Sequence, residues 1–106
     1  MAYRVELTDQ AQRDLENLHK RLPADDSNAV VSWLDQLEDA IFSLERFPLR
    51  CPLAPEKRLS RRGIRHLLFG AKRDVYRVLY DIDEKHRIVR IRTVRHGSMD
   101  EFLLGK

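Results

Sequence analysis

Arginines interrupt an otherwise apolar stretch at residues 74–97, DVYRVLYDIDEKHRIVRIRTVRHG. The planar guanidinium group donates two parallel hydrogen bonds, which suits the recognition of a phosphate or a carboxylate. The two apolar runs of the stretch carry Arg77, Arg90, Arg92 and Arg95. Two interpretations stay open at this point. The arginines gather around an anionic partner, or three of them, Arg77, Arg90 and Arg92, are solvated cross-strand partners of acidic neighbours, namely Asp81, Asp83 and Glu84.

A second group of arginines lies just before this stretch and consists of Arg58, Arg61, Arg62 and Arg65. The charges of the chain are unevenly distributed. Residues 1–56 hold 6 Lys and Arg against 11 Asp and Glu, whereas residues 57–95 hold 13 against 4. Such a basic half favours an acidic protein partner or a nucleic acid. We hypothesise that the second group joins Arg77 and Arg95 in one concave cationic surface.

Two histidines, His66 and His96, lie in or beside predicted strands near these arginines. Either is a candidate general acid or base because its ordinary pKa is close to neutrality, although a structural role is the alternative for both. The single cysteine, Cys51, has no second cysteine or close histidine pair with which to hold a metal. No glycine-rich phosphate loop or nucleophile elbow is present. We therefore expect neither a metal nor a cofactor.

The elements that must position these residues follow from apolar spacing. Residues 3–7 alternate apolar and charged side chains, which predicts a short strand. Thr8 is the expected N-cap of a helix that Pro23 ends, with an apolar stripe of Ala11, Leu15, Leu18 and Leu22. Residues 25–27 offer an N-cap for a second helix that extends to Phe47. The short link predicts an antiparallel helical hairpin.

The second half of the chain is expected to be extended. Residues 48–62 contain three prolines and predict a long ordered loop. Three strands follow at 64–69, 74–82 and 87–95, and their short connections predict an antiparallel meander. The fold class is therefore α+β in the order β-α-α-β-β-β, with the helical hairpin packed on one face of an antiparallel sheet. The length of 106 residues fits a single domain, 1–106.

Strand alternation assigns these arginines to faces of the sheet. In the middle strand of the meander, Arg77 points away from the helices. In the last strand, Arg90 and Arg92 share one face, while Arg95 and Val89 share the other. Neither face of this last strand is purely apolar, so its register stays open.

The first ten residues, MAYRVELTDQ, carry charges where a signal peptide needs an apolar core. No window approaches the roughly 18 apolar residues of a membrane span. We expect a cytoplasmic protein without membrane association.

Several stretches together resemble the RelE/ParE superfamily, the toxins of bacterial type II toxin–antitoxin modules, whose ParE-like members include plasmid stabilisation proteins. The stretches are FPLRCPLAPE, GIRHLLFG, YRVLYDID and IVRIRTVRHGSMD, in the predicted order of elements over nearly the whole chain. The resemblance implies growth arrest and a cognate antitoxin that wraps an acidic or partly disordered segment around the toxin in a hetero-oligomer.

The superfamily divides by target. RelE-like members resemble ribosome-dependent endonucleases that cleave messenger RNA without a metal, and ParE-like members resemble inhibitors of DNA gyrase. Arg77 matches the strand arginine that nucleases use against phosphate, but ParE-like chains often carry it too. The basic and aromatic groups expected of a nuclease would fall near Gly97 and Leu103, where both are missing. The RHGSMD ending instead resembles ParE-like chains, with Met99 where an arginine is usual.

The resemblance therefore favours a ParE-like gyrase inhibitor that is not an enzyme. An mRNA endonuclease is the first alternative, with candidate catalytic residues Arg77, His96 and Arg65. An inactive relative that only binds an antitoxin is the second alternative. For contacts with a target or an antitoxin, the candidate residues are Arg61, Arg62, Arg65, Arg77, Arg95 and His96.

Overall fold

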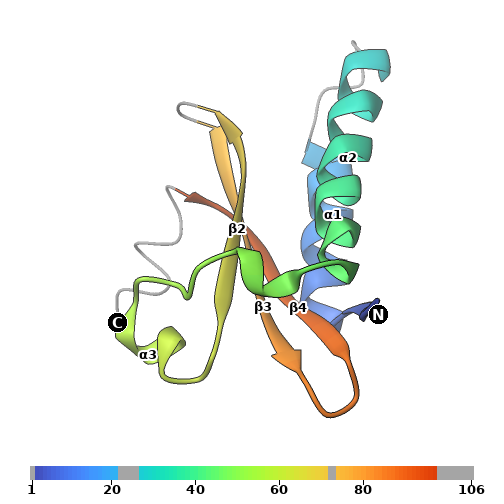
Figure 1. Cartoon of the computed structure of the whole chain (residues 1–106). Coiled ribbons are helices and arrows are strands. Elements are labelled where there is room, and N and C mark those ends of the chain that lie inside the picture. The colour runs from blue at the N-terminus through green and yellow to red at the C-terminus, as the bar shows by residue number, and fades with distance from the viewer. Residues whose placement is uncertain (1, 22–26, 72–73, 98–106) are drawn as a thin grey trace.

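The computed structural model describes residues 2–21, 27–71 and 74–97 (Figure 1). Its elements are β1 (Arg4–Leu7), α1 (Asp9–Arg21), α2 (Ser27–Phe42), α3 (Lys57–Ser60), β2 (Arg65–Ala71), β3 (Asp74–Asp83) and β4 (Ile88–His96). Two 3-10 turns, η2 (Ser43–Glu45) and η3 (Pro48–Arg50), follow α2. The predicted strands are confirmed to within one or two residues at each end. The second helix ends five residues before Phe47 because its last turn tightens into η2.

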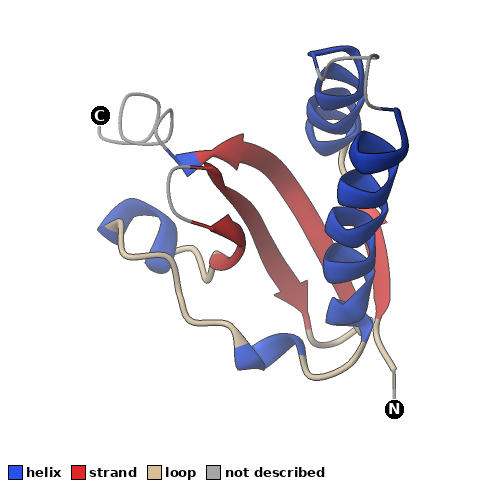
Figure 2. Ribbon diagram, turned by 90° about the horizontal axis from the view of Figure 1, so that it is seen from above, coloured by secondary structure: helices blue, strands red, loops and turns tan. Residues whose placement is uncertain are grey.

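The four strands form one sheet in the order β1-β4-β3-β2. The predicted meander is confirmed, since β2, β3 and β4 pair antiparallel. The sheet as a whole is mixed because β1 pairs in parallel with β4, with Val5 opposite Val89. A parallel pair needs a long crossover, which α1 and α2 provide. Figures 1 and 2 show α1 and α2 on one side of the sheet and α3 on the other. The predicted α+β class is therefore confirmed.

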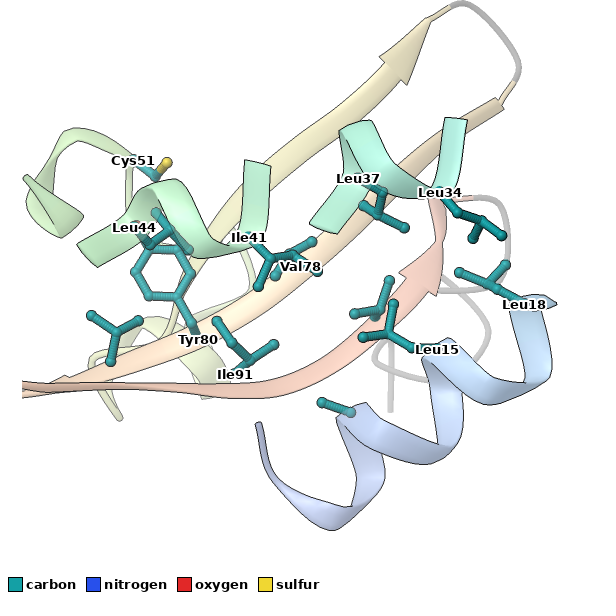
Figure 3. Packing of buried hydrophobic residues seen from close by; sticks show 13 residues of the cluster. Leu15, Leu18, Leu34, Leu37, Ile41, Leu44, Cys51, Val78, Tyr80 and Ile91 are labelled. Carbon is teal, nitrogen blue, oxygen red and sulfur yellow. The ribbon is translucent and has the colours of Figure 1, made fainter. Parts of the chain in front are cut away.

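The main core lies between the sheet and the two long helices (Figure 3). Its buried side chains come from the predicted apolar stripes, and they include Leu15, Leu18, Leu34, Leu37, Ile41, Leu44, Val78, Tyr80, Val89 and Ile91. Tyr80 is wholly buried, and its hydroxyl donates to the carbonyl oxygen of Pro48 at 2.6 Å. Burial raises the pKa of Tyr80 well above its ordinary value of 10.0, so the phenol stays neutral and remains a donor.

The start of α1 is attached to β4 by two polar side chains. Thr8 is the N-cap, as predicted, because its Oγ1 accepts from the N–H of Ala11 at 3.2 Å. The same hydroxyl lies 2.8 and 2.9 Å from the carbonyl oxygens of Ile91 and Arg92. One turn later, the buried carboxylate of Asp14 accepts from the N–H of Val94 at 2.9 Å and from the hydroxyl of Thr93. Thr8 and Asp14 therefore provide hydrogen-bond partners for backbone groups of β4 that a neighbouring strand would otherwise bind.

These contacts coincide with a β-bulge in β4. Leu79 of β3 lies opposite Thr93, but the next residue, Tyr80, lies opposite Ile91, so Arg92 has no counterpart in β3. An extra residue of this kind reverses which alternate side chains face the core. The prediction that Arg95 and Val89 share a face is therefore wrong. Val89 is buried on the helix side, whereas Arg95 pairs with Arg77 on the opposite side.

Residues 48–62 do not form the simple loop that the prolines predict, because α3 lies within them. This helix ends in a Schellman motif at Gly63, whose φ of 74° is accessible to glycine at little cost. The N–H of Gly63 donates to the Ser60 carbonyl, and the N–H of Ile64 donates to the Leu59 carbonyl, both at 3.0 Å. Leu59 and Ile64 then pack in a second apolar cluster against Leu79, on the far face of the sheet.

Some predictions fall outside the described residues. They concern Leu22 and Pro23 at the end of the first helix, the acidic part of the N-cap at 25–26, and the C-terminal segment 98–106. Among the described helices, none is long and apolar enough to cross a membrane.

We predict that Asp14→Ala lowers the free energy of unfolding by about 2 to 3 kcal/mol, because it leaves the Thr93 hydroxyl and the Val94 N–H buried without their acceptor. Urea denaturation at neutral pH measures this loss. The matched control is Asp39→Ala at an exposed position of α2, for which we expect a change below about 0.5 kcal/mol. Equal losses in the two variants would contradict the assigned role of Asp14.

Candidate functional site

A buried ion pair joins Arg77 of β3 to Glu56, the residue before α3. The two guanidinium nitrogens of Arg77 donate to the two carboxylate oxygens of Glu56 at 2.7 and 2.9 Å, in the bidentate geometry that arginine favours. The side chains are 10% and 24% exposed. These hydrogen bonds from Arg77 hold the pKa of Glu56 below its ordinary value of 4.5. The carboxylate is therefore ionised at neutral pH, and while it is paired with Arg77 it is a weaker proton acceptor than an unpaired glutamate.

The positions of Arg77 and Glu56 follow from the local folding of two segments. Arg77 points away from α1 and α2, as its place in the strand alternation predicts, because Val78 on the next position enters the main core. Glu56 reaches the same face because α3 is fixed there by the packing of Leu59 against Ile64 and Leu79. The face that the long helices leave uncovered is thus partly covered by α3 and its flanking segment.

His66 is the third titratable group of this region. It lies in β2 opposite Leu79, two positions along the ladder from the pair formed by Arg77 and Leu68. Burial, with a further contribution from the Arg77 charge, lowers the pKa of His66 below its ordinary value of 6.5. The imidazole is therefore neutral at neutral pH. Its Nδ1 is buried and has no hydrogen-bond partner among the described residues. We call Glu56, His66 and Arg77 the far-face cluster.

Three further candidate arginines, Arg61, Arg62 and Arg65, have different surroundings. Arg65 donates to the carbonyl oxygen of Cys51 at 2.6 Å, which fixes the segment before α3 against the start of β2. Arg61 and Arg62 are exposed at the end of α3. They remain candidates for contact with a partner.

Arg90 and Arg92 are cross-strand partners of one carboxylate, that of Asp81. Arg90 donates at 3.0 Å and Arg92 at 2.6 Å, and Asp81 is itself buried. The contact with Asp81 raises the pKa of Arg90 above its ordinary value. For these two arginines the solvated cross-strand interpretation is confirmed, while Arg77 pairs with Glu56 instead.

Arg95 and His96 line a cleft of about 580 Å³ at the end of β4. Its other walls include Asn17 and Arg21 of α1. The ring of His96 meets that of Tyr76 edge to face at 5.0 Å between centroids, and its Nε2 lies 3.5 Å from the Asp74 carboxylate. His96 pairs with Tyr76 on the helix side of the sheet, whereas Arg77 lies on the far face. His96 therefore lies on the other face of the sheet from Arg77, whereas Arg95 is the ladder partner of Arg77.

The structural contacts of two acidic residues, Glu56 and Asp14, were not predicted. Glu56 lies 21 positions from Arg77 in a proline-rich segment, and no regular spacing connects the two. The only sequence signal is that Glu56 is the one acidic residue immediately before a run of basic ones. Among the described residues, no group of three or more His, Cys, Asp or Glu side chains is arranged to hold a metal ion.

Comparisons with known proteins agree with the resemblance in sequence. A family model described as ParE toxin of type II toxin-antitoxin system, parDE, matches residues 5–101. Toxin RelG of Mycobacterium tuberculosis is 38% identical over 98 residues, which cover 92% of this chain and 94% of RelG.

Solved structures give the same result for the fold. A chain of the toxin-antitoxin complex RelBE2 from Mycobacterium tuberculosis superposes with a TM-score of 0.65 at 30% identity, covering 91% of this chain and 99% of that one. A mutant of the E. coli toxin RelE in the free state gives a TM-score of 0.61 at 16% identity, covering 98% and 93%. At 16% identity the likeness concerns the fold alone.

The ion pair between Glu56 and Arg77 predicts how stability depends on pH. Because the folded state lowers the pKa of Glu56, the pair contributes fully above 4.5, and this contribution is lost as the pH falls through the lower value of the folded state. We expect the free energy of unfolding to fall more steeply below pH 4.5 in the wild type than in Glu56→Gln. The effect of His86 on the pKa of Asp83 is common to both proteins and cancels in the difference. Identical pH profiles from urea denaturation would contradict this role of the pair.

Proposed function

We propose, from the premise that the chain belongs to the ParE toxin family and is a toxin of a type II toxin-antitoxin system, that it arrests growth by cleaving RNA. The observation that carries this proposal is the far-face cluster, in which the guanidinium of Arg77 pairs with the carboxylate of Glu56 and the imidazole of His66 lies on the same sheet face two ladder positions away. These three groups can catalyse phosphodiester transfer without a metal.

Each group of the far-face cluster has a chemical role in this proposal. Glu56, kept ionised by Arg77, accepts the proton of a 2′-hydroxyl as its oxygen attacks the adjacent phosphorus. Arg77 donates to the phosphate oxygens, on which negative charge grows in the transition state. The 5′-oxygen leaves and takes up the proton that Glu56 received, directly or relayed by His66, so that Glu56 is ionised again and a 2′,3′-cyclic phosphate remains. His66, neutral at neutral pH, is the adjacent group that can accept or return a proton.

The relatives support an RNA target through the RelE-like side of the superfamily. Both the 38% identical toxin RelG and the 30% identical chain of the RelBE2 complex are named as Rel toxins. The basic residue that nucleases of this type place near Gly97 has little room here, since a Cβ at Gly97 would lie 3.0 Å from the Val75 carbonyl oxygen. In our proposal Glu56 and His66 supply the acid–base function instead.

Inhibition of DNA gyrase, which the sequence favours, is the second candidate function. It is supported by the ParE description of the matching family model and by the RHG sequence at residues 95–97. In that case Arg95 and His96, beside the cleft at the end of β4, are the proposed contacts with the target.

We further propose that the chain is neutralised by a cognate antitoxin in a hetero-oligomer within the cytoplasm. The basic second half of the chain supports an acidic segment as the binding partner. The relatives of known structure from Mycobacterium tuberculosis and E. coli were solved as toxin-antitoxin complexes, RelBE2 and RelBE.

We predict that expression of the chain alone from a tightly controlled promoter stops growth and creates new RNA 5′ ends within translated messages. Glu56→Gln should restore growth and reduce cleavage about 100-fold, because the proton acceptor is lost while the side chain keeps its shape. Growth curves and sequencing of RNA 5′ ends in the same cultures measure both effects.

The matched control is Glu16→Gln, which removes an exposed carboxylate of α1 and should act as the wild type. Thermal unfolding checks that Glu56→Gln remains folded, since breaking one side of a buried pair costs about 3 kcal/mol or more when a charge is left alone. Intact messages together with relaxed plasmids would instead support gyrase inhibition. Unimpaired growth with folded protein present would mean that the chain is an inactive relative which only binds its antitoxin.

A further inference from the structure

A large apolar side chain is presented to solvent at the turn between η2 and η3. Phe47 is 80% exposed, and its φ of 52° and ψ of 55° place it in the left-handed region. This conformation is disfavoured for a non-glycine residue, and the position before Pro48 is normally extended. A strained residue persists only where its surroundings determine it, and such residues are frequent at binding sites.

Contacts within the turn hold Phe47 in this conformation. The guanidinium of Arg50 donates to the carbonyl oxygen of Arg46 at 2.8 Å and to the hydroxyl of Ser43 at 2.7 Å. The N–H of Arg50 donates to the carbonyl oxygen of Phe47 at 3.0 Å. Pro48 is buried, and its carbonyl oxygen accepts from the core phenol of Tyr80. The aromatic ring is therefore displayed by a preorganised turn.

Phe47 forms one wall of a groove of about 910 Å³, whose lining residues are Ala2, Tyr3, Arg46, Phe47, Pro48, Leu49, Arg50 and Arg87. We call this the Phe47 groove. Among the described residues, the non-glycine residues with positive φ are Phe47 and Arg87, and both line it. The Arg87 guanidinium lies 4.4 Å from the centroid of the Tyr3 ring, a cation–π distance. Leu49, 56% exposed, adds a second apolar side chain.

The charges around the groove have one sign. Three arginines line it, and none of the lining residues is acidic. The hydroxyl of Tyr3, which lines the groove, donates to the carboxylate of Glu84 at 2.8 Å. Aromatic side chains and arginines are enriched at the centres of protein–protein interfaces, and the groove contains both.

We propose that the Phe47 groove is a docking site for a segment of the antitoxin that carries carboxylates and at least one large apolar side chain. The partner's apolar group packs against Phe47 and Leu49, and its carboxylates pair with Arg46, Arg50 and Arg87. The inference rests on the proposed presence of an antitoxin, but not on the far-face cluster. It assigns to the partner a surface formed by the start of β1, the η2–η3 turn and the β3–β4 turn.

Charge and polarity favour this occupant over two others. A second copy of the chain would bring the same three arginines against each other, which is repulsive. A nucleic acid would satisfy the arginines, but it would leave the phenylalanine and leucine side chains of the groove against phosphate and sugar. An acidic segment with apolar anchors satisfies both kinds of group.

The test measures the affinity of the full chain for the polypeptide encoded by the reading frame beside its gene, by titration calorimetry. The decisive variant is Phe47→Gly with Leu49→Ser. Glycine is suited to the left-handed position, so we expect the turn to keep or gain stability while the aromatic ring is lost. The dissociation constant should rise at least 30-fold, as for the loss of an interface hot spot. In cells, this variant should stay toxic and escape neutralisation by the partner.

Two matched controls separate the groove from general surface effects. Leu68→Ala removes an apolar side chain that is 55% exposed on β2, and Arg13→Glu reverses an exposed charge on α1. Both should change the dissociation constant less than about threefold, whereas Arg46→Glu should raise it about tenfold, with a larger effect at low salt.

An unchanged affinity in the Phe47→Gly and Leu49→Ser variant, with wild-type binding intact, would overturn the docking site alone. A wild-type dimer that becomes a monomer in this variant would overturn it in favour of a second copy. Absence of any binding by the wild type would overturn both the docking site and the antitoxin proposal. RNA cleavage without the partner tests the far-face cluster separately.

Discussion

The arrangement of the sheet depends on the bulge at Arg92 and on Thr8 and Asp14, which attach α1 to β4 beside it. Strand β1 pairs with β4 only as far as Ile91, and from that point the Thr8 hydroxyl contacts the carbonyl oxygens of Ile91 and Arg92 while Asp14 accepts from the N–H of Val94. The N-cap of α1 therefore does more than start a helix, because it also fixes the helix against the central strand β4. Once β4 is bent and its alternation reversed, Val89 and Val94 can both enter the core although an even alternation would separate them.

This bulge also explains where the sequence was informative and where it was not. Periodicity located both long helices, their buried stripes and the three strands of the meander, because each of these features repeats along the chain. The faces of β4 could not be assigned, since a period of two assumes that no residue is inserted. Because of the bulge, apolar side chains and arginines do not alternate regularly along β4. The position of the bulge became known only from the pairing with β3.

The candidate site shows a second limit of the sequence. The concentration of positive charge in the second half predicted a cationic surface, but net charge does not reveal pairing. Asp81 engages two arginines, Glu56 engages a third, and a backbone carbonyl engages Arg65. Such contacts join residues that are distant in sequence or separated by a turn, so only the folded chain shows which charges remain available. Exposed arginines lie at the end of α3, and three further arginines line the Phe47 groove.

In the proposed function, the ion pair of Glu56 and Arg77 has to stabilise the fold and also take part in catalysis. The pair fixes α3 and its flanking segment against the sheet. If Glu56 and Arg77 only stabilised the fold, apolar side chains of similar volume could replace both at little cost in stability. A group that only bound phosphate would be more accessible than a guanidinium side chain that is 10% exposed. An RNA phosphate can therefore reach Arg77 only by sharing it with Glu56 or by shifting the short helix. In the proposed function that exchange favours catalysis, because the hydrogen bonds from Arg77 lower the pKa of Glu56, and moving them to the phosphate makes the carboxylate a stronger acceptor for the 2′-hydroxyl proton. In the proposed function, stability and activity at this face are thus coupled through the same two side chains.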